Sequence, residues 1–340
     1  MHGSAQAVVT ERLTRVFRGK RDKNGQAKPF TALDQVDIEI GRGELFGILG
    51  PNGAGKTTLI KILSTLLAPT SGRAFVGGTD VMRDPYAVRR MINMVSGGEH
   101  SGYGILTVRE NLWMFSQFYG VPTKAALSNI DTMMERLNFS QERDTKINKL
   151  STGMRQKMNF IRGFVNDPEI LFLDEPTLGL DVAAARDVRG YIKSWVSSGR
   201  GKTVLLTTHY MADAEELCDR IAIIDSGKIL ACDTPANLKR RVTRDSVLRI
   251  EIASHEDRSD EFRDLPGVKR LAAAHKPGTN TSELTMIIQD DSVLSLVVKT
   301  VSDIGSTILS LRKEEPSLED VFLEVVGRRL TDDASPVNKP

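Results

Sequence analysis

The chain has 340 residues, of which 40% are hydrophobic and 26% charged, an ordinary composition for a globular protein with room for two domains. Its 46 Lys and Arg residues nearly balance 44 Asp and Glu residues, so a net charge of +2 argues against bulk nucleic-acid binding. Two cysteines without CxxC spacing argue against a disulfide framework or a zinc site, and no apolar run approaches the roughly 20 residues that span a bilayer.

Four short apolar runs in the first two-thirds of the chain predict buried β-strands. They cover residues 45–49, 170–173, 203–207 and 221–224, and helical patterns such as that of residues 183–196 lie between them. Runs that are apolar throughout, rather than at every second position, indicate a sheet covered on both faces. We therefore predict an α/β fold with a mainly parallel core sheet.

A glycine-rich loop joins the first of these strands to a helical pattern. Residues 50–57 fit the phosphate-binding pattern G-x-x-x-x-G-K-[ST] in the required strand–loop–helix context. Backbone N–H groups of such a loop point at phosphate oxygens, and the helix N-terminus adds partial positive charge. Lys56 is expected to reach the β- and γ-phosphates, and the Thr57 hydroxyl to hold Mg²⁺. The expected nucleotide-binding residues of this segment are Gly50, Asn52, Gly53, Ala54, Gly55, Lys56, Thr57 and Thr58.

Two carboxylates follow the second predicted strand. Asp174 and Glu175 come directly after residues 170–173, at the strand end where ligands bind in open α/β sheets. We expect Asp174 to hold Mg²⁺ through water and Glu175 to activate the attacking water as general base. An acidic loop after a strand means little alone, but with residues 50–57 it predicts a site for nucleotide hydrolysis.

The pattern changes near residue 238. An alternating strand over residues 248–252, a strand at 284–288, a helix at 292–301 and a helix N-cap at Ser317 predict a small α+β domain. We expect a first domain over residues 1–240, this accessory domain over 241–330 and a flexible, proline-containing tail over 331–340. Regulation, dimerisation and bracing of the first domain all remain possible roles for the accessory domain.

Three further motifs give the chain a resemblance to the ATP-binding cassette (ABC) ATPases. Residues 150–154 (L-S-T-G-M) resemble the family's signature motif, Leu180-Asp181 its D-loop, and His209 its switch histidine. The match runs from about residue 13 to about residue 238. It implies an ABC nucleotide-binding domain, with an antiparallel β subdomain and a helical subdomain beside the core sheet.

The resemblance implies a head-to-tail dimer of two copies of the chain. ATP would be bound between residues 50–57 of one copy and the signature motif of the other. Ser151 and Gly153 open a helix, so their hydroxyl and N–H groups would contact the γ-phosphate across the interface. Asp181 would link the two nucleotide sites.

The resemblance also adds to the catalytic residues. His209 would contact the γ-phosphate and act with Glu175 and Lys56 in catalysis. Phe17 lies where the family often places an aromatic ring that stacks on adenine. ATP and Mg²⁺ are the ligands that this set implies.

The sequence departs from the family pattern in two motifs. Thr152 and Met154 replace the usual Gly and Gln of the signature motif. The Gln of the Q-loop is replaced by Gly97, which has no side chain to contact Mg²⁺ or water, and Glu99 is the candidate to take over.

The C-terminal part favours export. Residues 316–322, and residues 217–221 together with 224–229, resemble exporter ATPases of the daunorubicin-resistance and sodium-extrusion type. This implies efflux through separate transmembrane permease subunits, with the chain at the cytoplasmic face of the membrane and no nucleic acid as partner.

Two rival classes fit less well. A soluble ABC ATPase acting on nucleic acid or ribosomes would carry a long coiled coil between Lys56 and Asp174, or two cassettes, and this chain has one P-loop and no sustained heptads there. A GTPase would carry N-K-x-D, whereas Asn148-Lys149 is followed by Leu150-Ser151.

Overall fold

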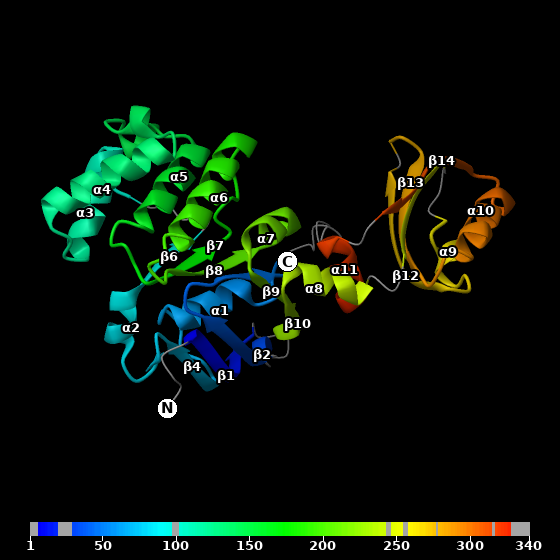
Figure 1. Ribbon diagram of the computed structural model, residues 1–340, viewed down its shortest axis with the longest axis horizontal. Helices are drawn as coiled ribbons and strands as arrows, with labels where there is room; N and C mark the ends of the chain where they lie inside the picture. Colours follow the sequence, from blue (N-terminus) through cyan, green and yellow to red (C-terminus); the bar gives the residue numbers. More distant parts are fainter. Residues whose placement is uncertain are drawn as a thin grey trace. The chain divides into compact units, whose positions relative to one another are not determined.

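The computed structural model describes residues 6–19, 29–96, 102–242, 246–253, 258–276, 278–314 and 317–327. The chain divides into two compact units, Met1–Ile229 and Leu230–Pro340 (Figure 1). The division lies earlier in the chain than the boundary expected at residue 240. The expected tail at residues 331–340 lies outside the described part of the chain. None of the described helices is long and apolar enough to cross a membrane.

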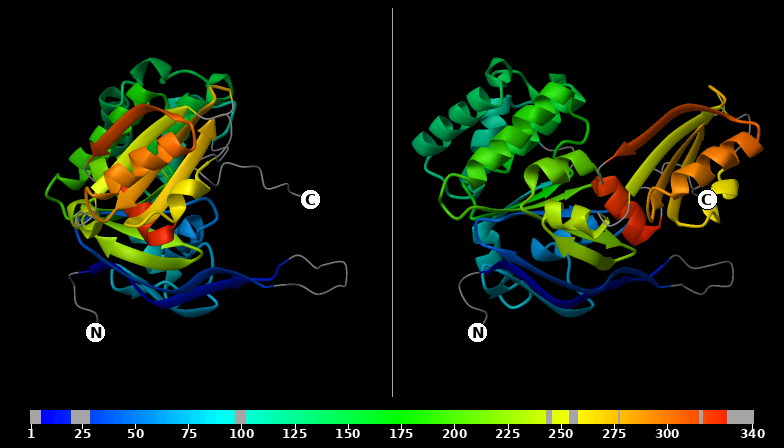
Figure 2. Two further views of the ribbon diagram at one scale, coloured as in Figure 1. Left: turned by 90° about the vertical axis from the view of Figure 1, so that its right-hand side faces the viewer. Right: turned by 45° about the vertical axis from the view of Figure 1, so that its right-hand side comes forward.

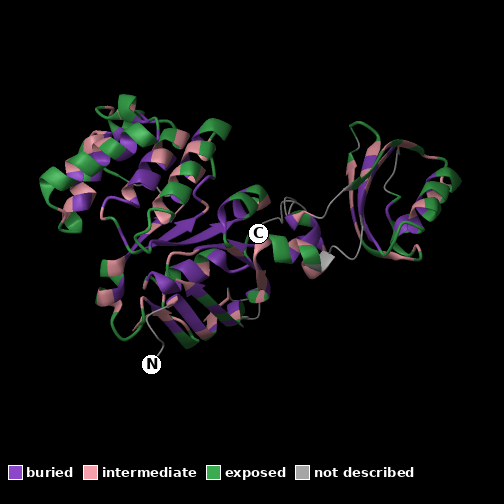
Figure 3. Cartoon of the chain, in the orientation of Figure 1, coloured by how far each residue is buried: buried purple, intermediate pink, exposed green. Residues whose placement is uncertain are grey.

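A six-stranded sheet with the order β10-β9-β3-β8-β7-β6 forms the core of the first unit, and β10 leads into the second (Figure 1). Neighbouring strands from β9 to β6 are parallel, and every residue of β3, β7 and β8 is buried (Figure 3). The predicted parallel sheet, covered on both faces, is therefore confirmed. The strands are β3 (Leu45–Leu49), β6 (Ile92–Ser96), β7 (Ile170–Asp174), β8 (Thr203–Thr208), β9 (Arg220–Asp225) and β10 (Lys228–Asp233).

The first unit also contains a four-stranded antiparallel sheet with the order β2-β1-β4-β5. Its strands are β1 (Gln6–Phe17), β2 (Phe30–Gly41), β4 (Ser71–Val76) and β5 (Thr79–Asp80). The register of β1 and β2 ends with Phe17 opposite Phe30, so the two aromatic side chains are cross-strand neighbours.

Helices connect the strands of the first unit. Arg109 at the start of α3 donates hydrogen bonds of 3.0 and 2.9 Å to the Asp131 carboxylate of α4, which joins these two helices and lowers the pKa of Asp131. The helices are α1 (Lys56–Leu63), α2 (Pro85–Met91), α3 (Val108–Phe118), α4 (Thr123–Arg136), α5 (Thr152–Arg162), α6 (Val182–Val196) and α7 (Met211–Leu217), with 3₁₀ turns at Ser140–Glu142 and Ile147–Lys149.

The second unit contains a β-α-β-β-α-β arrangement. The antiparallel strand order β12-β13-β11-β14 is that of a ferredoxin-like fold. Helices α9 and α10 cover one sheet face, where Leu248, Ile250 and Ile252 are buried together (Figure 2). The elements are α8 (Pro235–Val242), β11 (Ser246–Ala253), α9 (Asp260–Arg263), β12 (Val268–Lys276), β13 (Thr281–Ile288), α10 (Val293–Asp303), β14 (Thr307–Glu314) and α11 (Leu318–Val326).

The sequence predicted most, but not all, of the second unit. Ser317 caps α11 in a capping box with Asp320, as its sequence pattern indicates. The strand predicted at 284–288 and the helix predicted at 292–301 are parts of β13 and α10. Strands β12 and β14 and helices α8 and α9 were not predicted. The second domain is α+β, as expected.

Candidate nucleotide site

The glycine-rich loop between β3 and α1 depends on two glycines that no other residue could replace. A Cβ atom at Gly50 would lie 2.3 Å from the Ile224 carbonyl oxygen. A Cβ atom at Gly55 would lie 2.4 Å from the Ala32 carbonyl oxygen, and Gly55 has a φ of 109° at the N-cap of α1. The loop is therefore packed tightly against its surroundings and leaves the N-terminus of α1 ready to receive an anion.

The Lys56 ammonium is held inside the loop. It donates hydrogen bonds of 2.6 Å to the Gly50 carbonyl and 3.1 Å to the Pro51 carbonyl, and it lies 3.5 Å from Glu175 Oε1. Burial lowers the pKa of Lys56, and the carboxylates of Glu175 and Asp174 oppose this shift. The Lys56 ammonium is thus held within the anion-binding loop by backbone carbonyls.

Asp174 ends β7 and joins two neighbouring elements through its carboxylate. Its Oδ2 accepts a 2.8 Å hydrogen bond from the Thr57 hydroxyl, and its Oδ1 accepts a 2.5 Å hydrogen bond from the Thr207 hydroxyl of β8. Thr207 was missed from the sequence. The signal for it was its place at the end of a predicted strand, since parallel neighbours end at the same sheet edge.

Glu175 lies between two candidate catalytic groups. Its backbone has a φ of 55°, and its N–H donates to the Thr207 carbonyl at 3.0 Å. The Glu175 Oε2 atom lies 2.6 Å from His209 Nδ1, a contact that is an ion pair when the imidazole is protonated. The structure therefore brings together Lys56, Glu175 and His209, which the sequence separates widely.

These residues line a cavity of about 520 Å³. Of the expected nucleotide-binding residues, Phe17, Asn52, Gly53, Gly55, Lys56, Thr57 and Thr58 border it, as do Glu175 and His209; Gly50 and Ala54 contribute backbone to the loop behind it. Four residues outside the expected set, Phe30, Ala32, Pro51 and Leu178, also line it.

Phe30, which was not expected from the sequence, is the cross-strand neighbour of Phe17. Its side chain is 55% exposed, and the Arg15 guanidinium lies 4.5 Å from the centre of the Phe17 ring. The sequence feature that could have predicted Phe30 is Asn24-Gly25, a dipeptide typical of hairpin turns, which indicates that the flanking residues pair. The two rings form the apolar part of the cavity lining, whereas Lys56 and Glu175 form its charged part.

We expect Phe17→Ala to weaken ATP binding by about 1–3 kcal/mol, because base–aromatic stacking contributes that much per base. The affinity for inorganic tripolyphosphate, which has no base, should stay unchanged in the same titration. Phe118→Ala removes a 70% exposed ring elsewhere and serves as the control. An equal loss for ATP and tripolyphosphate would contradict the assignment of this ring to adenine.

The remaining expected residues do not line the cavity within one chain. Ser151 caps α5 by accepting the Met154 N–H at 3.2 Å, and Asp181 caps α6 by accepting the Ala184 N–H at 2.8 Å. Ser151 and Asp181 are exposed, and Gly153 is partly exposed in the first turn of α5. The prediction that Ser151 and Gly153 open a helix is confirmed. Gly97 and Glu99 of the Q-loop lie outside the described residues.

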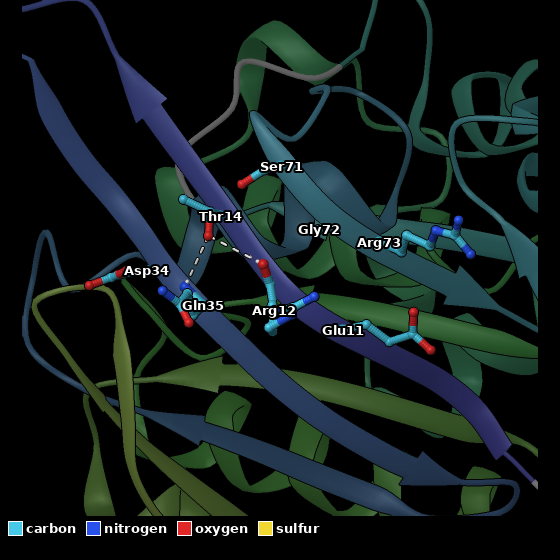
Figure 4. Close-up of a pocket in the computed structure, with 8 residues that line it drawn as sticks. All are labelled: Glu11, Arg12, Thr14, Asp34, Gln35, Ser71, Gly72 and Arg73. Carbon is cyan, nitrogen blue, oxygen red and sulfur yellow. Dashed lines mark hydrogen bonds between the residues drawn. The ribbon is translucent and has the colours of Figure 1, made fainter.

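A second cavity, of about 610 Å³, lies on the antiparallel sheet (Figure 4). The Thr14 hydroxyl in it donates to the Arg12 carbonyl at 3.2 Å and accepts the Gln35 N–H at 3.1 Å. Its lining mixes both charges, with Glu11 and Asp34 beside Arg12 and Arg73. None of the expected site residues lines this cavity.

Comparison with known proteins agrees with the geometry. Residues 33–178 match the family model of the ABC transporter, and residues 234–326 match that of the ATP-binding protein DrrA1-3-like, C-terminal domain. The chain is 37% identical to the daunorubicin resistance ATP-binding protein DrrA2 of Streptomyces coeruleorubidus, over 88% of this chain and 91% of that protein. It is 33% identical to the daunorubicin/doxorubicin resistance ATP-binding protein DrrA of Streptomyces peucetius, over 96% and 94%.

The fold of the first unit also occurs among solved structures. One of them is the dimeric structure of a post-hydrolysis state of an ATP-binding cassette bound to ADP and Pi. It has a TM-score of 0.58 and 24% identity, and the match covers 67% of this chain and 98% of that one. With a P-loop, two carboxylates and a histidine gathered at the carboxyl edge of its sheet, the chain belongs to the ABC transporter family, as one of its ATP-binding proteins with ATPase activity.

Proposed function

We propose that the chain powers export of a small molecule through separate membrane permease subunits, hydrolysing ATP between two copies of itself. One observation carries the proposal of a site shared between two copies. Lys56, Glu175 and His209 meet at the P-loop cavity, while Ser151 and Asp181 face outward from the same chain. The site is therefore half complete in one copy, and the exposed helix N-terminus of α5 is suited to complete it in another.

The P-loop would receive the triphosphate. Backbone N–H groups of Gly53 and Gly55 and the N-terminus of α1 supply partial positive charge. The Lys56 ammonium would exchange its carbonyl partners, Gly50 and Pro51, for β- and γ-phosphate oxygens. Charged partners strengthen such hydrogen bonds, so the exchange is favourable.

Thr57 and Asp174 would hold Mg²⁺. Their oxygen atoms are 2.8 Å apart beside the P-loop, and a hydroxyl with a carboxylate is the hard oxygen set that Mg²⁺ prefers. When bound, Mg²⁺ neutralises charge on the β- and γ-phosphate oxygens.

Glu175 would be the general base. It takes a proton from the water that attacks the γ-phosphorus, the bond to the ADP oxygen breaks, and ADP and phosphate leave. His209, 2.6 Å from its carboxylate, would orient Glu175 and contact the γ-phosphate. The contact with His209 thus holds the Glu175 carboxylate, the proton acceptor, in position before ATP binds, so the site is preorganised.

The export role rests on the relatives. The Streptomyces coeruleorubidus protein is named for resistance to daunorubicin and the Streptomyces peucetius protein for resistance to daunorubicin and doxorubicin, and both match this chain along both of its units. We infer a similar role here, with the chain held at the cytoplasmic face of the membrane by its permease. A soluble role on nucleic acid or ribosomes is less well supported, because the longest described helix between Lys56 and Asp174 is α4, with 14 residues.

Mixing two inactive variants tests the shared site. Ser151→Asp keeps a good N-cap on α5 but puts negative charge against the γ-phosphate of the partner copy. Glu175→Gln removes the general base. Each variant alone should lose more than about tenfold in ATPase rate. Their mixture should regain activity, because one of the two sites in a mixed dimer is unchanged. That site combines Glu175 of the Ser151→Asp copy with Ser151 of the Glu175→Gln copy. A mixture as inactive as its components would contradict a site built from two copies.

A further inference from the structure

A buried hydrogen-bond network lies behind the nucleotide site and has no role in the proposal above. At its centre is Asp213 of α7, which is 5% exposed. One carboxylate oxygen accepts a 2.5 Å hydrogen bond from the Thr177 hydroxyl, and the other accepts a 2.8 Å hydrogen bond from Arg189 Nη1 of α6. Both oxygens of a buried anion are thus satisfied by groups from two other elements.

The three members of this network follow the expected functional residues in the chain. Thr177 lies two residues after Glu175, and Asp213 lies four residues after His209. Arg189 belongs to α6, the helix that Asp181 caps. Helices α6 and α7 lie side by side (Figure 1). One carboxylate therefore joins the segments that carry Glu175, His209 and Asp181.

The segments between the network and the site are short, and backbone hydrogen bonds connect them internally. The loop after Glu175 is closed by hydrogen bonds from the Leu178 N–H to the Glu175 carbonyl at 3.2 Å and from the Leu180 N–H to the Thr177 carbonyl at 3.2 Å. On the other side, the Ala214 N–H donates to the Tyr210 carbonyl at 3.3 Å. A shift of Thr177 relative to Asp213 would therefore move Glu175 relative to His209.

We propose that Asp213 is a positioning residue for ATP hydrolysis, acting through the hydroxyl of Thr177. Their hydrogen bond keeps the Glu175 loop in register with the His209 turn and so maintains the 2.6 Å contact between Glu175 and His209. This inference rests on the proposed roles of those two residues. The Thr177–Asp213 hydrogen bond stabilises an arrangement of Glu175 and His209 that matters only in the transition state. Its loss should therefore lower kcat rather than weaken the binding of ATP.

The rest of the network allows a matched control. Arg189 Nε lies 2.9 Å from Glu216 Oε2, and Lys193 Nζ lies 3.6 Å from Glu216 Oε1. Glu216 contacts Arg189 from the same helix as Asp213, whereas the Thr177 hydroxyl donates its hydrogen bond to Asp213. Glu216→Gln therefore perturbs the ion pairs between α6 and α7 and leaves the bond to the Glu175 loop in place.

The test uses the full-length chain with Thr177→Val, which keeps the shape of threonine and removes its hydroxyl. This choice leaves the Arg189–Asp213 ion pair intact, whereas removing Asp213 would leave a buried arginine without its partner. We expect kcat to fall about tenfold, since small misplacements of reacting groups are costly. The KM for ATP should stay within about twofold, and Thr177→Ser should restore kcat because it restores the hydroxyl.

Wild-type kcat in Thr177→Val would overturn the inference, and so would a loss that Thr177→Ser fails to restore. A fall in kcat for Glu216→Gln as large as that for Thr177→Val would assign the effect to the packing of α6 against α7 and would also overturn it. Failure of the proposed function has a different signature, because Glu175→Gln would then retain turnover whatever Thr177→Val does. Circular dichroism melting shows that each variant is folded at the assay temperature.

Discussion

Glu175→Gln is expected to bind ATP, to hold two copies of the chain together and to lose turnover. A carboxamide has nearly the size of the carboxylate and can still lie beside His209 and Lys56, but it cannot take a proton from water. Loss of a general base lowers kcat by about 10²–10⁴-fold. Light scattering with and without ATP and Mg²⁺ should show a doubling of mass only when both are present.

The control for this variant is Glu169→Gln. Glu169 precedes the other end of β7, and its side chain pairs with Arg42 at 3.3 Å on the surface. The same chemical change there should leave turnover and mass unchanged, because exposed ion pairs contribute little. A Glu175→Gln chain that stays monomeric with ATP bound would argue against the shared site. Turnover near that of the wild type would argue against Glu175 as the base.

Lys56→Ala should weaken nucleotide binding itself. The ammonium is the buried cation of the P-loop, and each charge-assisted hydrogen bond to phosphate is worth roughly 1.5–3 kcal/mol. Loss of two such bonds should lower the affinity for ATP by at least about 100-fold, a change that isothermal titration calorimetry measures directly. The two variants therefore separate binding from chemistry: Glu175→Gln keeps the first and loses the second, and Lys56→Ala loses both.

Lys61→Ala provides the matched control for Lys56→Ala. Lys61 lies on the same helix, α1, and its side chain is exposed in the last turn. It should bind ATP like the wild type. Unchanged ATP affinity in Lys56→Ala would contradict the assignment of this lysine to the phosphates, even if turnover were lost.

The prediction of the nucleotide site from sequence succeeded where the signal is local. Residues 50–57 fit a spacing typical of phosphate-binding loops, and Asp174 and Glu175 follow a short apolar run that indicates a buried strand. The prediction of β12 failed because its sequence, V-K-R-L-A-A-A-H-K, has neither a strict alternation nor β-branched residues in its centre. The four residues of α9 are too few for a helical period to be visible.

The assignment of partner residues depends on a second copy of the chain. Ser151, Gly153 and Asp181 are exposed or partly exposed at the starts of α5 and α6, and within one chain Ser151 and Asp181 serve as helix caps. Their sequence pattern indicated a helix start correctly, because capping is a local interaction. Their contact with nucleotide stays a prediction, which the mixing experiment addresses.

By itself, the sequence determined four of the six strands of the core sheet, the phosphate loop, the helix caps and the family, all of which depend on residues close together in the chain. Only the tertiary structure decided which side chains meet. Thr57 and Asp174 are 117 positions apart, Thr207 and Asp174 are 33 apart, and Thr177 and Asp213 are 36 apart. These contacts follow from the strand order β3-β8-β7, which places the carboxyl ends of the strands side by side. Strand order is set by the burial of whole apolar faces, and no short stretch of sequence records it.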